Sequence, residues 1–272
     1  MRRLQNPSEP IWSPLLISIL TLGAMAPVAA QDVATDWAQT SALSAPPARE
    51  QARTASKSAA NDSEAGAMIA QGMKDMRAFR AEQAKGAEPK AYAVKKTPVR
   101  YVNDLLRMMA AREGRLAHAT WLYQTQQYAT AVDSGLFPDK LISADGAKAR
   151  AGLSTIEQKL REYEKEMVAA QGDFMKTFAA INMPEKESTA RYLQQRGVKH
   201  LAWMKRRVQA ERVTHAVTRR IVDLVTERRA VFSLRDGKVS IADLQGERQY
   251  GELVRELQGA LAQYEAIRAE PD

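Results

Sequence analysis

The stretch STIEQKLREYEKEMVAAQGDFMKTFAAI, residues 154–181, decides the fold of this chain. Apolar side chains recur through it mostly at steps of four and three residues, at Ile156, Leu160, Tyr163, Met167, Ala170, Phe174, Phe178 and Ile181. This spacing is close to the 3.5-residue repeat of a coiled-coil seam, in which one stripe of a helix packs against a partner. Because the stripe mixes Tyr, Ala and Phe, it favours a helical hairpin or bundle over a two-stranded zipper.

The predicted start of this helix is Ser154, because Ser154 and Glu157 match a capping box. We therefore expect residues 137–152 to form a connecting loop, with a turn at Asp145 and Gly146.

Further helices are predicted on both sides. Thr97 and Pro98 begin a helix that runs to about Val132, and a second helix runs from Pro184 to about Arg229. The last helix is predicted to be capped by Ser240, with Asp243 in the capping-box position. A weaker first helix is expected to begin at residues 61–63.

Only residues 231–241 (VFSLRDGKVSI) resemble strands, because apolar residues alternate around an Asp-Gly turn pair. A hairpin packed on helices and a plain loop both fit this segment. The sequence therefore predicts an all-α fold, an elongated antiparallel bundle with coiled-coil-like hairpins and at most one small β-hairpin.

The first thirty residues have the pattern of a cleavable signal peptide. Arg2 and Arg3 precede a short apolar run at 15–26, and the small residues 28–30 suit cleavage before Gln31. The run is shorter than the roughly 20 apolar residues that span a bilayer. We expect a periplasmic protein, the alternative being an uncleaved signal that anchors the chain in the inner membrane.

Four segments follow from these patterns. Residues 1–30 are the signal peptide, and residues 31–60, rich in Ala, Ser, Thr, Gln and Pro, are a flexible leader. Residues 61–97 form a loose helix plus a linker, and residues 98–272 form the helical bundle domain.

Composition and motifs give no sign of catalytic chemistry. The chain has no cysteine, which excludes disulfides, thiolate metal ligands and thiol nucleophiles. Phosphate-binding glycine motifs are absent, and the three histidines do not have metal-ligand spacing. We expect no enzymatic activity, no cofactor and no metal.

The most distinctive feature is a basic segment from Arg191 to Arg229. It holds 11 basic and 3 acidic residues, a balance of +8 (11 − 3), against +8 for all 272 residues. Nine residues are candidates for binding an anion or a partner: Arg196, Lys199, Trp203, Lys205, Arg206, Arg207, Arg212, Arg219 and Arg220. The alternative is a helix whose charges pair with acidic neighbours such as Glu162, Glu164 and Glu166.

These patterns together predict an exported interaction or scaffold protein, a component or adaptor of an envelope assembly such as a secretion or conjugation machine. Other envelope proteins, or a second copy of the chain, are the expected partners. The alternative is a module that binds an anionic polymer or lipid headgroups through residues 191–229.

Overall fold

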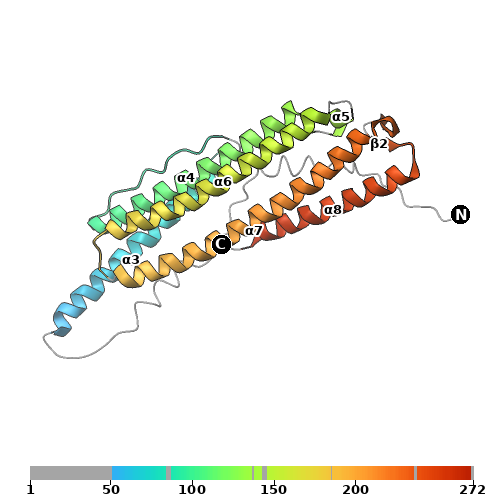
Figure 1. Cartoon of the computed structure of the whole chain (residues 1–272). Helices are drawn as coiled ribbons and strands as arrows, with labels where there is room; N and C mark the ends of the chain where they lie inside the picture. Colours follow the sequence, from blue (N-terminus) through green and yellow to red (C-terminus); the bar gives the residue numbers. More distant parts are fainter. Residues whose placement is uncertain are drawn as a thin grey trace. The chain divides into compact units, whose positions relative to one another are not determined.

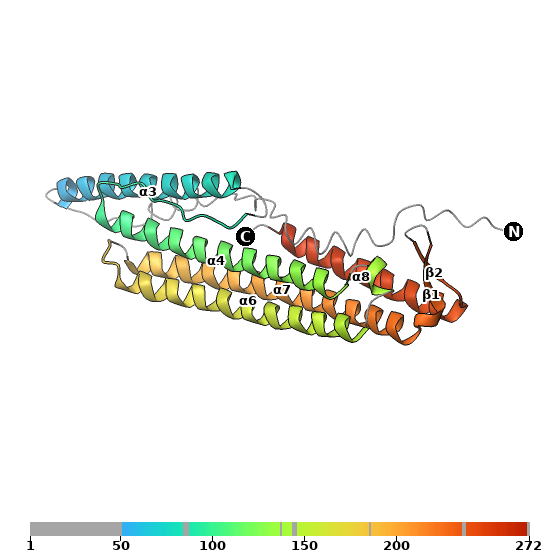
Figure 2. The ribbon, with the colours of Figure 1, turned by 90° about the horizontal axis from the view of Figure 1, so that it is seen from above.

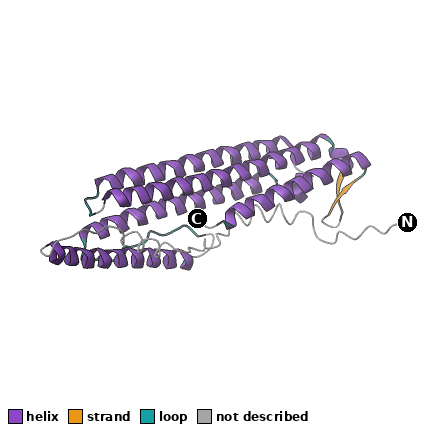
Figure 3. Ribbon diagram, turned by 90° about the horizontal axis from the view of Figure 1, so that it is seen from below, coloured by secondary structure: helices purple, strands orange, loops and turns teal. Residues whose placement is uncertain are grey.

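The computed structural model confirms the all-α prediction, since almost all of the chain it describes is helical (Figure 3). It describes residues 51–83, 87–136, 138–142, 146–184, 186–235 and 238–270, with backbone alone at 51–63, 138, 139, 235 and 238. The helices are α3 (Gln51–Glu82), α4 (Arg100–Asp133), the short α5 (Pro138–Leu141), α6 (Gly146–Ala180), α7 (Lys186–Glu227) and α8 (Leu244–Ala269).

Residues 1–50, which hold the predicted signal peptide and most of the predicted leader, lie outside the described residues. None of the described helices is both long enough and apolar enough to cross a membrane.

The long helices divide between two compact units. The first, here called the hairpin unit, comprises Ala119–Glu166 and Leu201–Glu270. The second, here called the α3 unit, comprises the described residues up to 118 together with Met167–His200. Within the hairpin unit, α8 lies beside α7, and α4 lies beside α6 (Figures 1 and 2).

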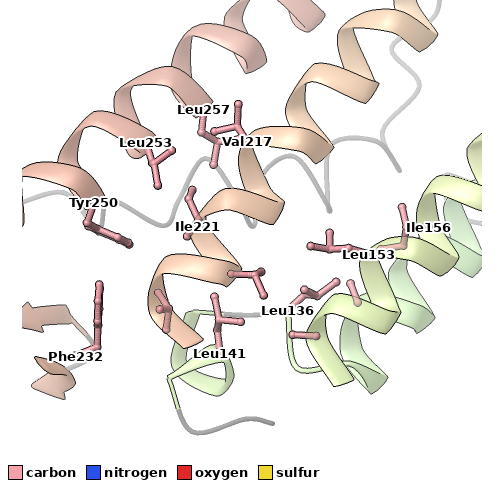
Figure 4. Packing of buried hydrophobic residues seen from close by; sticks show 14 residues of the cluster. Leu136, Leu141, Leu153, Ile156, Val217, Ile221, Phe232, Tyr250, Leu253 and Leu257 are labelled. Carbon is pink, nitrogen blue, oxygen red and sulfur yellow. The ribbon is translucent and has the colours of Figure 1, made fainter. Parts of the chain in front are cut away.

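The predicted seam of α6 is buried over its whole length. Leu160 is 1% exposed and Phe178 is 2% exposed, and the same four-three spacing continues upstream to Leu153 and Ala149, which are 2% and 0% exposed. Leu153 and Ile156 belong to the core of the hairpin unit. In this core, Leu253 and Leu257 of α8 face Val217 and Ile221 of α7 (Figure 4). The buried members of the core are Ala131, Leu136, Leu141, Ala149, Leu153, Ile156, Val217, Ile221, Val222, Val225, Phe232, Tyr250, Leu253 and Leu257.

The predicted start of α6 at Ser154 is wrong. The helix begins at Gly146, and the Ser154 hydroxyl donates to the Arg150 carbonyl at 3.1 Å, as a serine inside a helix does. Burial of Ala149 and Leu153 explains the difference, because packing outweighs a local capping pattern. The predicted loop at 137–152 is therefore interrupted by α5 and ends at Gly146.

The C-terminal end of α4 agrees more closely with the sequence than its start, which lies at Arg100 and not at the predicted Thr97 and Pro98. Gly135 has a positive φ of 66°, its N–H donates to the Val132 carbonyl at 3.2 Å, and the Leu136 N–H donates to the Ala131 carbonyl at 3.0 Å. These bonds are those of a Schellman motif, which ends a helix with glycine in the left-handed region. By contrast, α3 begins at Gln51 and not at 61–63, because the alanine-rich residues before Asn61 favour helix.

The segment 231–241 is a β-hairpin, so the hairpin alternative is correct. Strands β1 (Phe232–Arg235) and β2 (Lys238–Ile241) pair antiparallel, with Phe232 opposite Ile241. Phe232 is 5% exposed, and its ring packs against that of Tyr250 on α8 in a T-shaped arrangement, with centroids 5.7 Å apart (Figure 4). This contact supplies the packing on a helix that a two-stranded hairpin requires.

Helix α8 is capped by Asp243, so the prediction that Ser240 caps it is wrong. Ser240 lies in β2, and the Asp243 carboxylate accepts from the Gly246 N–H at 2.8 Å. The same carboxylate forms an ion pair with the Arg228 guanidinium at 3.0 Å, and this pair connects the end of α7 to the start of α8.

We expect Asp243→Ala to lower the free energy of unfolding by about 1–2 kcal/mol, because it removes both the helix cap and the Arg228 pair. Urea unfolding followed by circular dichroism measures this change. Ser154→Ala is the matched control. The exposed Ser154 hydroxyl caps no helix and only accepts a 3.2 Å bond from Arg219 besides donating to Arg150, so its effect should stay below about 0.5 kcal/mol. Equal losses in the two variants would contradict this assignment of the caps.

Candidate functional site

Two of the nine sequence-predicted residues tie α7 to α8. The Arg206 guanidinium binds both oxygens of Glu270, at 2.9 and 2.5 Å. Arg220 donates to both oxygens of Glu256 at 2.7 Å. All four side chains keep part of their surface in solvent, so each pair contributes modestly to stability while favouring one alignment of the two helices.

Two more tie α7 to α6. Arg212 reaches Glu164 at 2.6 Å, and Arg219 reaches Glu157 at 3.0 Å. A reversed pair lies further along, where Arg150 of α6 reaches Asp223 of α7 at 2.6 Å. Glu164 is one of the acids that the sequence offered as a partner for α7.

A second of those acids, Glu162, has partners on its own helix. It accepts from Lys159 at 2.8 Å and from Gln158 at 3.1 Å. These hydrogen bonds hold the pKa of Glu162 below its ordinary value.

Trp203 and Arg207 lie against the C-terminal turn of α8. The Trp203 indole N–H donates to the Ile267 carbonyl at 2.8 Å. Arg207 Nε donates to the Tyr264 hydroxyl at 3.2 Å, and its guanidinium lies 5.9 Å from the Trp203 ring centroid and 5.7 Å from that of Tyr264. A helix C-terminus has unpaired carbonyls and a negative dipole end, so an indole N–H and an arginine stabilise it.

The contact between Arg207 and Tyr264 also shifts the pKa values of both side chains. Burial lowers the pKa of Arg207, but Tyr264, Tyr163 and Glu211 raise it more strongly, and the net pKa lies above its ordinary value. Burial raises the pKa of Tyr264 to about 12, although Arg207 opposes it. Arg207 therefore stays charged and Tyr264 stays neutral at neutral pH.

The remaining candidates, Arg196, Lys199 and Lys205, show no ion pair to a carboxylate within the chain segments that the structure describes. Arg196 donates to the Tyr192 hydroxyl at 3.1 Å, one turn earlier on α7. Lys199 and Lys205 are exposed. The structure therefore does not gather the nine residues into one cluster, because most are distributed among contacts with α6 and α8.

A buried polar cluster that sequence reasoning did not single out lies in the hairpin unit between α4 and α7. It comprises Tyr123 and Gln127, each 4% exposed, with Glu211 at 4% and His215 at 6%. Each pair is four residues apart on its own helix, so its side chains point the same way. One sequence signal was present, since Glu211 and His215 continue the four-three spacing that begins at Met204 and Val208.

The Glu211 carboxylate is held by neutral donors. It accepts from the Tyr123 hydroxyl at 2.5 Å and, more weakly, from the Gln127 amide at 3.4 Å. Burial, and next the charge of Glu211, raise the pKa of Tyr123 well above its ordinary value, so the phenol keeps its proton. Loss of this donor would leave a buried carboxylate under-satisfied, which costs about 1–3 kcal/mol or more.

Further hydroxyl and ring contacts extend the cluster to α6. The Tyr123 ring stacks on that of Tyr163, with centroids 5.1 Å apart. The Tyr163 hydroxyl shares a hydrogen bond of 3.2 Å with the Thr120 hydroxyl. The buried charge of Glu211 is thus surrounded by side chains from α4 and α6 as well as from its own helix.

His215 is buried and neutral. Its Nε2 lies 3.4 Å from the Gln127 amide nitrogen and 3.9 Å from Glu211. Burial lowers its pKa, and Arg219 adds to the effect, while the negative charges of Glu211 and Glu157 oppose it. The His215 Nδ1 and Gln127 Oε1 atoms are buried and find no partner among the described residues.

The chemistry open to this cluster is hydrogen bonding and charge burial. Nowhere in the described segments do three acidic or histidine side chains come close enough to hold a metal ion. One carboxylate among neutral donors serves mainly to make one alignment of α4 against α7 more favourable than its alternatives.

Comparison of the chain with protein families, with curated proteins and with solved structures found no match.

Acidification should destabilise the protein through His215. Because burial lowers its pKa in the folded state, the unfolded state binds more protons, and stability falls as pH drops through about 6.5. We expect unfolding at pH 5.5 to require less urea than at pH 7.5, with His215→Gln reducing the difference. Each unit of pKa depression corresponds to about 1.4 kcal/mol.

The matched control is His118→Gln, because His118 is half-exposed beside Glu88. This variant should keep the full pH dependence. Carboxylates such as Asp75 and Asp173, whose pKa values are lowered by hydrogen bonds, titrate below this window. An unchanged pH dependence in His215→Gln would show that His215 is not the responsible group.

Proposed function

We propose that this protein is an exported helical interaction or scaffold protein, a component or adaptor of an envelope-associated assembly such as a secretion or conjugation machine. It acts by contact and needs no cofactor or enzymatic step. The signal-peptide pattern of residues 1–30 supports export to the periplasm, with retention of an uncleaved signal in the inner membrane as the alternative. Its expected partners are other envelope proteins or a second copy of the chain.

The observation that supports this proposal most strongly is that basic residues of α7 form ion pairs with neighbouring helices of the same chain. Arg206 and Arg220 bind carboxylates of α8, and Arg212 and Arg219 bind carboxylates of α6. A helix that uses its charge to join its neighbours supplies rigidity, which is what a scaffold requires. It leaves fewer cations for an external anionic polymer.

Exposed apolar side chains are the first places to look for partner contacts. Val198 on α7 is 62% exposed, and Leu244 at the start of α8 is 72% exposed. Both positions therefore serve as probes for an interface.

A photo-crosslinking residue is placed at Val198 or Leu244 of the full chain, which is expressed in the cells that naturally make it. We expect it to capture one or two envelope proteins in near-stoichiometric yield. The matched controls are the exposed polar positions Gln194 on α7 and Gln258 on α8. Mass spectrometry of the adducts identifies the partners, including a second copy of the chain. Failure of both apolar positions, with a monomer in light scattering, would contradict the scaffold proposal.

Binding of an anionic polymer or of lipid headgroups is the second candidate function. Lys199 and Lys205 favour it, because both are exposed on α7 and neither forms an ion pair within the described part of the chain. Arg206, Arg212, Arg219 and Arg220 are poor probes of this function. Their replacement would also break contacts with α6 or α8.

On this second candidate, Lys199→Gln with Lys205→Gln should weaken binding to vesicles that contain phosphatidylglycerol. The dependence of affinity on salt should also become shallower, by about one unit of log–log slope for each phosphate that the variant no longer neutralises. Vesicle co-sedimentation across a salt series measures both effects. The matched control is Gln194→Ala with Gln195→Ala, and equal affinity in both double variants would exclude a role for these lysines.

A further inference from the structure

The core against which helix α3 packs, here called the seat of α3, has an unusual composition. Within the α3 unit, α3 places Ala65, Ile69 and Met76 in a core that it shares with α4, α6 and the start of α7. The helices approach closely at Gly72, where an added Cβ would lie 2.6 Å from a Leu106 methyl group. Figure 2 shows α3 running alongside α4.

Methionines concentrate in this seat. Of the 11 methionines in the chain, seven belong to the cluster around α3: Met68, Met73, Met76, Met108, Met109, Met175 and Met183. Among the residues of the hairpin unit that the structure describes, Met204 is the one methionine. Methionine side chains are flexible and polarisable, so they fill such a seat without fixing one tight arrangement.

No side-chain hydrogen bond or ion pair joins α3 to α4, α6 or α7 among the side chains described from residue 64 onward. Its hydrogen bonds and ion pairs stay within α3 or run to the segment that follows it, as between Lys95 and Asp75 at 2.9 Å, and between Arg80 and the Lys90 carbonyl at 3.3 Å. The one charge interaction with α4 is the attraction of Arg80 to Glu113, without a hydrogen bond among the described side chains. The Arg80 Nη2 atom is buried without a partner. Helix α8, in contrast, is joined to α7 by three arginine–carboxylate pairs.

We propose that this methionine seat is an oxidation site, and that its conversion to methionine sulfoxide by hypochlorous acid releases α3 from the α3 unit. Each thioether sulfur loses two electrons and gains one oxygen atom. The chlorine of hypochlorous acid is reduced to chloride, and its proton is released. The product is a polar sulfoxide in place of an apolar thioether.

The proposal follows from what holds α3. Apolar contact is its principal attachment, so a polar sulfoxide inside the seat removes the main favourable term and finds few donors there. Five of the seven methionines are only partly buried, and a small oxidant can therefore reach them: Met68, Met73, Met109, Met175 and Met183. Met204 is only 7% exposed, so it should react more slowly than these five.

The test treats the full chain with sub-stoichiometric to modest excesses of hypochlorous acid and maps sulfoxides by peptide mass spectrometry. Hydrogen–deuterium exchange then reports each helix. We expect backbone amides of residues 65–79 to exchange at least about tenfold faster once the seat is oxidised, while residues 204–225 keep their protection. Methionine sulfoxide reductases A and B should restore the protection of α3.

Leucine variants assign the effect to the seat. Replacing the five partly buried methionines by leucine nearly conserves volume, and α3 should then stay protected after the same treatment. Met204→Leu is the matched control and should lose α3 protection as the parent does. The proposal fails if seat methionines resist oxidation, if sulfoxides form there without faster exchange, or if the five-leucine variant also loses α3 protection. If the five-leucine variant folds poorly, reductase treatment of the oxidised parent chain provides the same test, because it removes the sulfoxides without any substitution.

Discussion

Ion pairs between arginines of α7 and carboxylates of α6 and α8 favour one alignment of the helices in the hairpin unit. Arginines at 206, 212, 219 and 220 project to different sides of the helix and meet acids on α6 and α8. Each exposed pair contributes little alone. Because the pairs with α8 lie far apart along α7, at Arg206 and Arg220, a shift of α8 along α7 would break both at once. The ion pairs therefore favour one register, while the apolar seams supply most of the free energy of folding.

The same helix buries one acid among neutral donors. Glu211 is satisfied by Tyr123 and more weakly by Gln127, at a depth where an unpaired carboxylate would be costly. Seams made of apolar residues alone allow several alignments of similar free energy. A buried hydrogen bond allows few, and it therefore provides specificity at some cost in stability.

The sequence predicted those parts of the fold that depend on one segment at a time. The α6 stripe and the glycine end of α4 depend on local spacing, and the structure confirms both. The alternation in residues 231–241 left a hairpin and a loop equally open, and the structure has the paired strands β1 and β2 there. The capping box at Ser154 was misleading, because a pattern on two residues competes with burial of Ala149 and Leu153. The pairing of Tyr123 with Glu211 could not be predicted, because it joins residues 88 positions apart whose contact depends on how α4 packs on α7. The hydrogen bond from Trp203 to the Ile267 carbonyl likewise could not be predicted, because it joins residues 64 positions apart on α7 and α8.

The close approach at Gly72 has a consequence for what α3 is when it stands alone. Glycine is among the weakest helix formers, costing about 1 kcal/mol relative to alanine, and Gly66 lies in the same helix. The glycine that lets α3 touch Leu106 also weakens its helicity in water. Formation of α3 and its docking are therefore one coupled event. Away from its seat the segment would be a weakly ordered chain and not a preformed rod, so anything that receives it would have to fold it.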